Sequence, residues 1–190
     1  YLAHVATGQM KLSARRTPIG SFQGALSAVS APQLGAAAAR AALADAGVAG
    51  DAIDEVIFGC VLPAGLGQAP ARQAALAAGL AQSVPATTVN KMCGSGMKAL
   101  MIASDQILAG HARLSLAGGL ESMSNAPYLL LKARAGYRMG HSELIDHMFY
   151  DGLQSPWDGK AMGCFAESAA EKYGFTRAVQ DAFAAESVRR

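Results

Sequence analysis

The stretch ATTVNKMCGSGMKALMIASDQILAG, residues 86–110, raises the question of what this protein does. A short strand, ATTVN, leads into a helix expected from about Gly94 to Ala109, and the lone Cys93 stands where the strand gives way to the helix. Apolar residues at helical spacing indicate this helix. Met97 and Met101 belong to that apolar set, so we expect them in the core.

Helical and strand signals alternate on both sides of this stretch, which favours an α/β fold. Ser30 and Pro32 predict the start of an alanine-rich helix that Gly47 ends. After about residue 122 the signals are mixed and predict a less regular segment, followed by two helices. The other expected elements are strands over 55–61 and 113–119 and a helix over 69–78.

Composition and charge exclude several classes of protein. The chain has 190 residues, 52% of them hydrophobic and 16% charged, which is typical of a well-packed globular protein. A net charge of +2 gives no basic field, and the apolar runs are short and broken, so we expect neither a nucleic acid nor a membrane as partner. No secretory signal is visible, and three cysteines without CxxC spacing predict no disulfide framework and no metal site. These features favour reduced thiols and a cytoplasmic location.

The position of Cys93 allows two interpretations. A cysteine is often a small buried hydrophobe. A thiolate at a helix N-terminus is instead stabilised by the free N–H groups and the helix dipole, and is a nucleophile. Gly94 and Gly96 would let a substrate carbonyl approach the backbone, and the Cys93 N–H could donate to an oxyanion. We expect Cys60, within an apolar strand, to be core, and leave Cys164 open.

The same residues carry a rival pattern. Gly94 to Ala99 match G-x-G-x-x-A after a strand, and Glu121 ends the next strand, which is close to a dinucleotide-binding fingerprint. The preceding strand is polar, however, and the separation from Gly96 to Glu121 is long. The four histidines fall at no metal-ligand spacing, so we expect them to be solvated or capping.

Several segments together resemble the thiolase family. VNKMCGSGMKAL, residues 89–100, resembles its acyl-enzyme signature. ARRTPIGSFQGAL (14–26), AGGLESMSNAPY (117–128) and DGLQSPWDGKAMGCFAE (151–167) resemble further family segments in the same order. QMKLSA (9–14) matches the first strand but is more polar, and residues 1–8 have no counterpart.

The resemblance implies a thiolase-like layered α-β-α fold: an N-terminal mixed-sheet half and the start of an irregular loop domain. Residues 1–122 would form the core domain with the nucleophile and 123–190 part of the coenzyme A-binding loop domain. The second half of the family, with an activating histidine and a second cysteine, has no counterpart here, so we expect this chain alone to be inactive.

The resemblance also implies an activity and roles for matching residues. The activity is that of an acetyl-CoA acetyltransferase, which forms or cleaves 3-ketoacyl-CoA through an acyl-cysteine. Cys93 matches the nucleophile, and Leu153 and Met162 match positions that contact the pantetheine arm or the acyl pocket. Ala161 stands where many short-chain members have histidine, which leaves the acyl-chain preference open. Substrates would be coenzyme A thioesters, with no cofactor or metal, and the assembly a homodimer or homotetramer.

Three alternatives stay open. A ketoacyl synthase is the nearest enzymatic rival, although Cys-Gly-Ser-Gly and the GGLESMS segment favour a thiolase. A non-catalytic thiolase-like carrier of acyl-CoA and a dinucleotide-binding module belong to other classes. We interpret Glu121, Ser122 and Asn125, which fall in a family motif, as structural.

Overall fold

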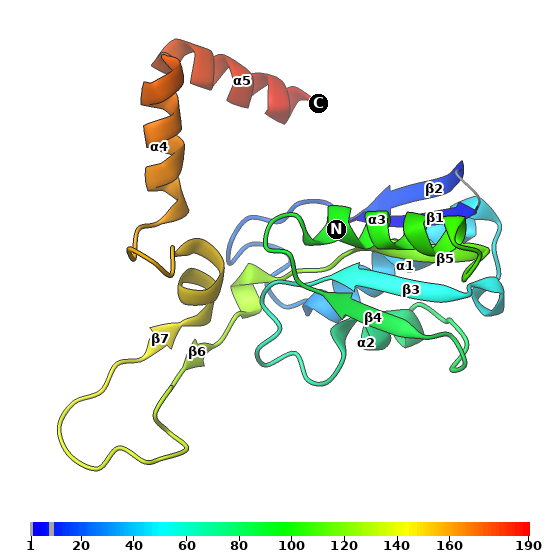
Figure 1. Cartoon of the computed structure of the whole chain (residues 1–190), viewed down its shortest axis with the longest axis horizontal. Helices are drawn as coiled ribbons and strands as arrows, with labels where there is room; N and C mark the ends of the chain where they lie inside the picture. The colour runs from blue at the N-terminus through cyan, green and yellow to red at the C-terminus, as the bar shows by residue number, and fades with distance from the viewer. Residues whose placement is uncertain (1, 8–9) are drawn as a thin grey trace. The chain divides into compact units, whose positions relative to one another are not determined.

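The computed structural model of the protein describes residues 2–7 and 10–190. The chain forms two compact units, the first ending at Met148 and the second running from Phe149 to Arg190 (Figure 1). The boundary expected at residue 122 concerns the domains of the resembled family and stays a prediction.

The first unit contains a five-stranded mixed sheet in the order β2-β1-β5-β3-β4. The central strand β5 pairs in parallel with β3 and antiparallel with β1, while β4 extends the parallel part beyond β3. The strands are β1 (Leu2–Thr7), β2 (Met10–Arg16), β3 (Glu55–Gly59), β4 (Ala86–Val89) and β5 (Leu114–Gly119).

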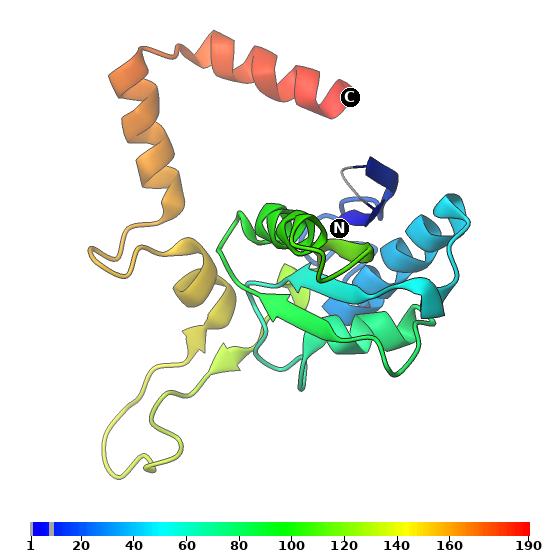
Figure 2. The ribbon, with the colours of Figure 1, turned by 45° about the vertical axis from the view of Figure 1, so that its right-hand side comes forward.

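Helices cover both faces of this sheet: α1 (Ala31–Ala46) and α2 (Pro70–Ala77) lie on one face and α3 (Ser95–Leu108) on the other (Figure 2). The chain moves from β3 to β4 through α2, then returns past β3 to β5 through α3. Right-handed crossovers in opposite directions place their helices on opposite faces. Strand order and chirality thus account for the α-β-α layering.

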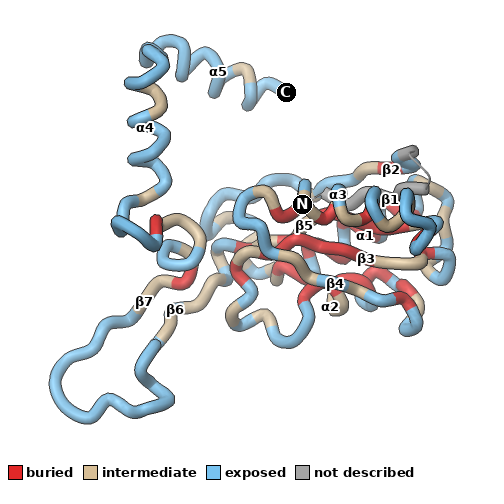
Figure 3. The backbone as a smooth tube through the Cα atoms, viewed as in Figure 1, coloured by how far each residue is buried: buried red, intermediate tan, exposed pale blue. Residues whose placement is uncertain are grey.

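The core follows the two-residue period of β3. Val56 and Phe58 are fully buried against α1 and α2, whereas Ile57 between them packs with Ala99 and Ala103 of α3. A strand covered on both faces is expected to read as one continuous apolar run, as this one does. Figure 3 shows the buried residues concentrated in this sheet and the helices that flank it.

Small residues let α1 pack closely. A Cβ at Gly35 would lie 2.9 Å from Leu120 Cδ2 and 3.4 Å from Ala74 Cβ, so a side chain there would have to displace Leu120. The predicted ends of α1 are confirmed: Ser30 and Gln33 form a reciprocal capping box, and Gly47 closes the helix with φ 64°.

The expected elements of the first unit are confirmed to within two residues at their ends. Strand β1 was not expected and is added beside β5. Hydrogen bonds to the Asp54 carboxylate from the backbone N–H of Arg113 (2.7 Å) and Leu114 (3.0 Å) tie the start of β3 to that of β5. These N–H donors lower the pKa of Asp54.

The expectation that Met97 and Met101 lie in the core is wrong for this chain. Their side chains are 71% and 52% exposed. The buried residues of the helix are instead the small Ser95, Ala99 and Ala103, which let the helix come close to the sheet. Leu100 and Ile102 pack at the edge of this contact, whereas Met97, Met101 and Leu108 form the exposed face of α3.

Beyond β5 the first unit becomes irregular. Strands β6 (Tyr128–Leu129) and β7 (Ile145–Asp146) pair antiparallel and flank an exposed loop over residues 130–144. Short 3-10 turns stand at Gly50–Ala52 and Met123–Asn125. Over the described residues, no helix combines the length and the apolar character that crossing a bilayer requires.

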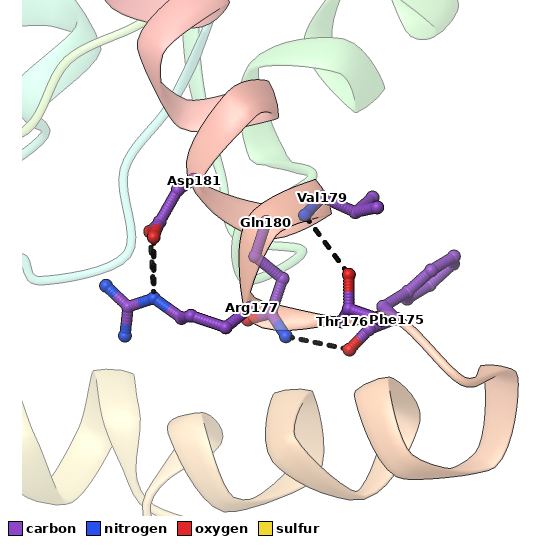
Figure 4. A network of polar contacts seen from close by, with 6 residues as sticks. All are labelled: Phe175, Thr176, Arg177, Val179, Gln180 and Asp181. Atoms are coloured by element: carbon purple, nitrogen blue, oxygen red, sulfur yellow. Dashed lines mark hydrogen bonds and ion pairs between the residues drawn. The ribbon is translucent and has the colours of Figure 1, made fainter.

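The second unit holds most of a π-helical turn, Met148–Leu153, and the helices α4 (Met162–Tyr173) and α5 (Arg177–Arg189). Thr176 caps α5 by accepting from Val179 N (3.4 Å). Gln180 Nε2 donates to Phe175 O (3.1 Å), and Arg177 pairs with Asp181 one turn on (Figure 4). These local contacts fix where α5 begins.

Candidate active site

The candidate site lies where the three parallel strands end. The carboxyl ends of β3, β4 and β5 lie along the same edge of the sheet, and ligands of open α/β sheets bind at this edge. The segments that follow the strands are Cys60–Leu62, Asn90–Gly94 and Leu120–Ser122. Cys93 is therefore placed at the edge where the topology predicts chemistry.

The turn that carries Cys93 is held by its own polar groups. Ser95 Oγ accepts from Lys91 N (2.9 Å) and donates to Met92 O (2.5 Å). Asn90 Oδ1 accepts from Met92 N (2.9 Å), and Gly94 N donates to Lys91 O (3.1 Å). Cys93 itself is exposed and lies just before Gly94, the N-cap residue of α3. The turn is thus ordered while the thiol stays accessible.

Glycines bring the start of α3 against the sheet. A Cβ at Gly59 would lie 2.5 Å from the carbonyl carbon of Ser95, closer than real Cβ contacts come. A Cβ at Gly96 would point toward Gly118 and Gly119 of β5, at 3.8–3.9 Å. The absence of a side chain at Gly96 therefore leaves room for the sheet. The sequence predicts instead that it leaves room for a substrate carbonyl.

The three thiols differ in environment. Cys93 is exposed, Cys164 is also exposed as the third residue of α4, and Cys60 is buried directly after β3. Cys60 Sγ donates to Glu121 Oε1 (3.6 Å). Burial, together with the negative charge of Glu121, raises the pKa of Cys60 to about 12. The expectation that Cys60 is core is confirmed.

The raised pKa of Cys60 predicts a loss of stability at alkaline pH. The folded thiol stays protonated while the unfolded thiol ionises near the ordinary cysteine pKa of 9.0, so unfolding releases a proton above that pH. The contribution of the protonated Cys60 thiol to the free energy of unfolding is fully present below about pH 9. It falls by about 1.4 kcal/mol per pH unit toward about pH 12. Urea unfolding of wild type and Cys60→Ala should show their stability difference shrinking by about 1 kcal/mol between about pH 8 and about pH 10. Parallel pH profiles would contradict this prediction.

Glu121 and Asn125 have structural contacts. Glu121 accepts hydrogen bonds from Val61 N (2.7 Å) and Leu62 N (3.0 Å), which fixes the chain as it leaves β3. Asn125 Nδ2 donates to Ser122 Oγ (2.9 Å) and to two backbone carbonyls of the loop before α1. These bonds fit the structural interpretation of the motif. The hydrogen bonds from Val61 N and Leu62 N also occupy the Glu121 carboxylate, which a dinucleotide-binding site would need for the ribose.

Leu153 and Met162 belong to the second unit, whereas Cys93 belongs to the first. Leu153 is half-buried at the end of the π-helical turn, and Met162 opens α4 with 43% of its surface exposed. An antiparallel bridge between Gln154 and Ala161 closes the loop between them. The structure thus brings these two residues together within one unit, and their contact with substrate stays a prediction.

Histidines and acidic groups of the described residues form no cluster of three that could hold a metal ion. His111 is exposed and contacts Gln106 Oε1 through Nδ1 (3.1 Å), as a solvated histidine does. His147 departs from the expectation of solvated histidines: it is buried, and its Nε2 accepts from Ala64 N (3.4 Å). His4 stands in β1, which was not expected as a strand.

Cys93 lies before a helix N-terminus, at the carboxyl edge of a layered α-β-α sheet. This is the fold and the cysteine position that the resemblance to the thiolase family implies. The chain belongs to the thiolase family: residues 12–190 match the family profile described as "Thiolase, N-terminal domain". The fold class inferred from the sequence and the resemblance to thiolases are thereby confirmed.

Individual relatives are similar over nearly the whole chain. The acetyl-CoA acetyltransferase of Pseudomonas aeruginosa is 52% identical over 94% of this chain and 46% of its own length. The acetyl-CoA acetyltransferase of Escherichia coli is 51% identical with the same coverage. The crystal structure of Acat5 thiolase from Ascaris suum in complex with coenzyme A superposes with a TM-score of 0.88 and 39% identity, over 100% of this chain and 47% of that chain. The chain thus spans about half the length of these relatives.

Proposed function

We propose that this chain is the nucleophile-bearing part of an acetyl-CoA acetyltransferase, which forms or cleaves 3-ketoacyl-CoA such as acetoacetyl-CoA. One observation carries the proposal: an exposed cysteine is held by an ordered turn directly before the N-terminus of α3. The chain around it is 52% identical to an acetyl-CoA acetyltransferase, which supports the same chemistry.

In the first step, the Cys93 thiolate attacks the carbonyl carbon of acetyl-CoA. A bond forms between Sγ and that carbon, the bond to the coenzyme A sulfur breaks, and coenzyme A leaves as a thiolate that takes up a proton. The N-terminus of α3 favours negative charge in the tetrahedral intermediate. The exposed thiol and its adjoining helix supply the nucleophile and a place for the negative charge, and we assign the base that takes the thiol proton to the part of the longer relatives that this chain does not span.

In the second step, another acetyl-CoA loses a proton from its α-carbon, and the resulting enolate attacks the acetyl group. The new carbon–carbon bond displaces Cys93 as a thiolate and yields acetoacetyl-CoA. This proton transfer needs a positioned base. Among the described residues, Cys93 makes no hydrogen bond to a histidine or carboxylate. We assign the base and the acid to the part of the longer relatives that this chain does not span.

The substrates follow from the same proposal. They are coenzyme A thioesters, with no further cofactor, and the coenzyme A bound to the similar Acat5 thiolase supports this class of ligand. Leu153 and Met162 would contact the pantetheine arm or the acyl group. The full-length protein would assemble as a homodimer or homotetramer.

Intact-mass spectrometry after incubation with acetyl-CoA tests the proposal. We expect the full-length gene product to gain the mass of one acetyl group, mapped by peptide analysis to Cys93. Cys164→Ala is the matched control, because Cys164 is also exposed and lies in the first turn of a helix. This variant should still be acetylated and Cys93→Ala should not. Binding of acetyl-CoA without a mass gain would favour the non-catalytic carrier instead.

A further inference from the structure

The backbone beside the nucleophile adopts an uncommon conformation. Met92 has φ 49°, in the left-handed region that residues with a side chain rarely occupy. Its side chain is 45% exposed, so burial of the methionine does not hold the backbone there. Such a conformation persists only where surrounding contacts determine it. The contacts on the two peptide groups of Met92 therefore identify what shapes the turn.

Two side chains hold Met92, one on each side. Ser95 Oγ donates to the carbonyl oxygen of Met92 at 2.5 Å, and Asn90 Oδ1 accepts from its N–H at 2.9 Å. Ser95 is the first residue of α3 and is buried. Asn90 lies outside both β4 and α3, and its bond to the N–H two residues on is the turn that asparagine forms readily.

Asn90 also connects this turn to the neighbouring strands. Its Nδ2 donates to Val61 O at 3.4 Å, and Val61 N donates to Glu121 Oε2 at 2.7 Å. Val61 follows β3 and Glu121 follows β5, so the amide of Asn90 ties the Cys93 turn to the ends of both strands. A half-exposed turn is in this way fixed to the rigid part of the sheet.

We propose that Asn90 is a positioning residue for acyl transfer: its side-chain amide fixes the left-handed turn at Met92 and so sets the direction in which the Cys93 thiol meets the thioester. Asn90 acts through the backbone and makes no hydrogen bond to the thiol. The inference rests on the proposed function, in which Cys93 is the nucleophile. A nucleophile displaced by about 1 Å can lose about 100-fold in rate.

Three variants of the full-length gene product test this role. Asn90→Ala removes the acceptor, and we expect acetyl-transfer kcat to fall about 10- to 100-fold while KM for acetyl-CoA changes less than about threefold. Asn90→Asp keeps an oxygen that can accept from Met92 N and should retain more activity than Asn90→Ala. Adding Met92→Asn to Asn90→Ala should restore kcat to within about threefold of wild type, because asparagine enters the left-handed region more readily.

Thr88→Val serves as the matched control for lost stability. Thr88 lies on β4, two residues before Asn90, and its hydroxyl accepts from Ala71 N (3.0 Å) without contacting the turn. This variant should lower the melting temperature and leave kcat within about twofold of wild type. Melting temperatures of all variants are measured alongside kcat.

The outcomes separate this inference from the proposed function. If Cys93→Ala still transfers acetyl groups, the proposed function itself is wrong. If Cys93→Ala is inactive and Asn90→Ala stays within about twofold of wild type, the positioning role alone is overturned. A loss in Asn90→Ala that Met92→Asn leaves in place also overturns it, because Asn90 would then not act through the left-handed turn.

Discussion

Gly59→Ala is expected to lower the free energy of unfolding by about 3 kcal/mol. The added Cβ would lie 2.5 Å from the Ser95 carbonyl carbon and 2.7 Å from Gly96 N. Both are backbone atoms, so no side chain can rotate away and the start of α3 has to move. The turn that carries Cys93 moves with it, and we expect acetylation of Cys93 to be lost together with stability. Urea unfolding and intact-mass analysis measure the two effects.

Gly119→Ala is the matched control for this prediction. Gly119 ends β5, next to β3, but a Cβ there would meet its nearest atom, Gly96 Cα, at 3.5 Å, an ordinary contact. We expect a change in stability of less than about 1 kcal/mol, since alanine also restricts the unfolded chain. Equal destabilisation by the two substitutions would show that the close approach at Gly59 is not what matters.

Replacing Cys93 by alanine is expected to lower kcat for thiolysis of acetoacetyl-CoA by about 10⁴-fold or more in the full-length gene product. Covalent catalysis divides the reaction into two steps, and neither can proceed without the nucleophile. Binding of acetoacetyl-CoA should persist, because the thiol contributes to the reaction more than to ground-state contacts. Steady-state kinetics and calorimetric binding measure the two quantities.

The control for this loss is again Cys164→Ala, which removes an exposed thiol from the second unit. Its kcat should remain within about twofold of wild type. Residual turnover by Cys93→Ala at a tenth of the wild-type rate or more would contradict a covalent mechanism through this residue.

Much of the fold could be predicted from local signals. Both ends of the helix after Ser30 can be predicted, because capping by Ser30 and the left-handed closure at Gly47 depend only on nearby residues. The apolar run of β3 and the strand-to-helix passage at Cys93 are equally local. The position of Cys93 before the N-terminus of α3 can therefore be predicted without tertiary contacts, whereas its role as nucleophile stays a prediction.

The features of the fold and the site that the sequence does not predict depend on long-range contacts. Strand β1 has no strong pattern of its own and is defined by its pairing with β2 and β5. Helical periodicity shows that α3 has an apolar face but not that its small residues are the ones packed on the sheet. The role of Gly59 depends on Ser95 and Gly96, which lie more than 30 residues away in the sequence. For Asn90 the only local signal was its place two residues before Met92.

The central place of β5 also sets the order in which the site can assemble during folding. The tie between the Cys93 turn and the strand ends is complete only when Glu121, which follows β5, has accepted the hydrogen bond from Val61 N. Strand β5 follows β3 by more than 50 residues and must insert between β1 and β3, a non-local step that forms slowly. Until then the Val61 peptide lacks its bond to Glu121. We therefore expect this tie to the strand ends to form late in folding, after the local bonds that Asn90 and Ser95 make within the turn.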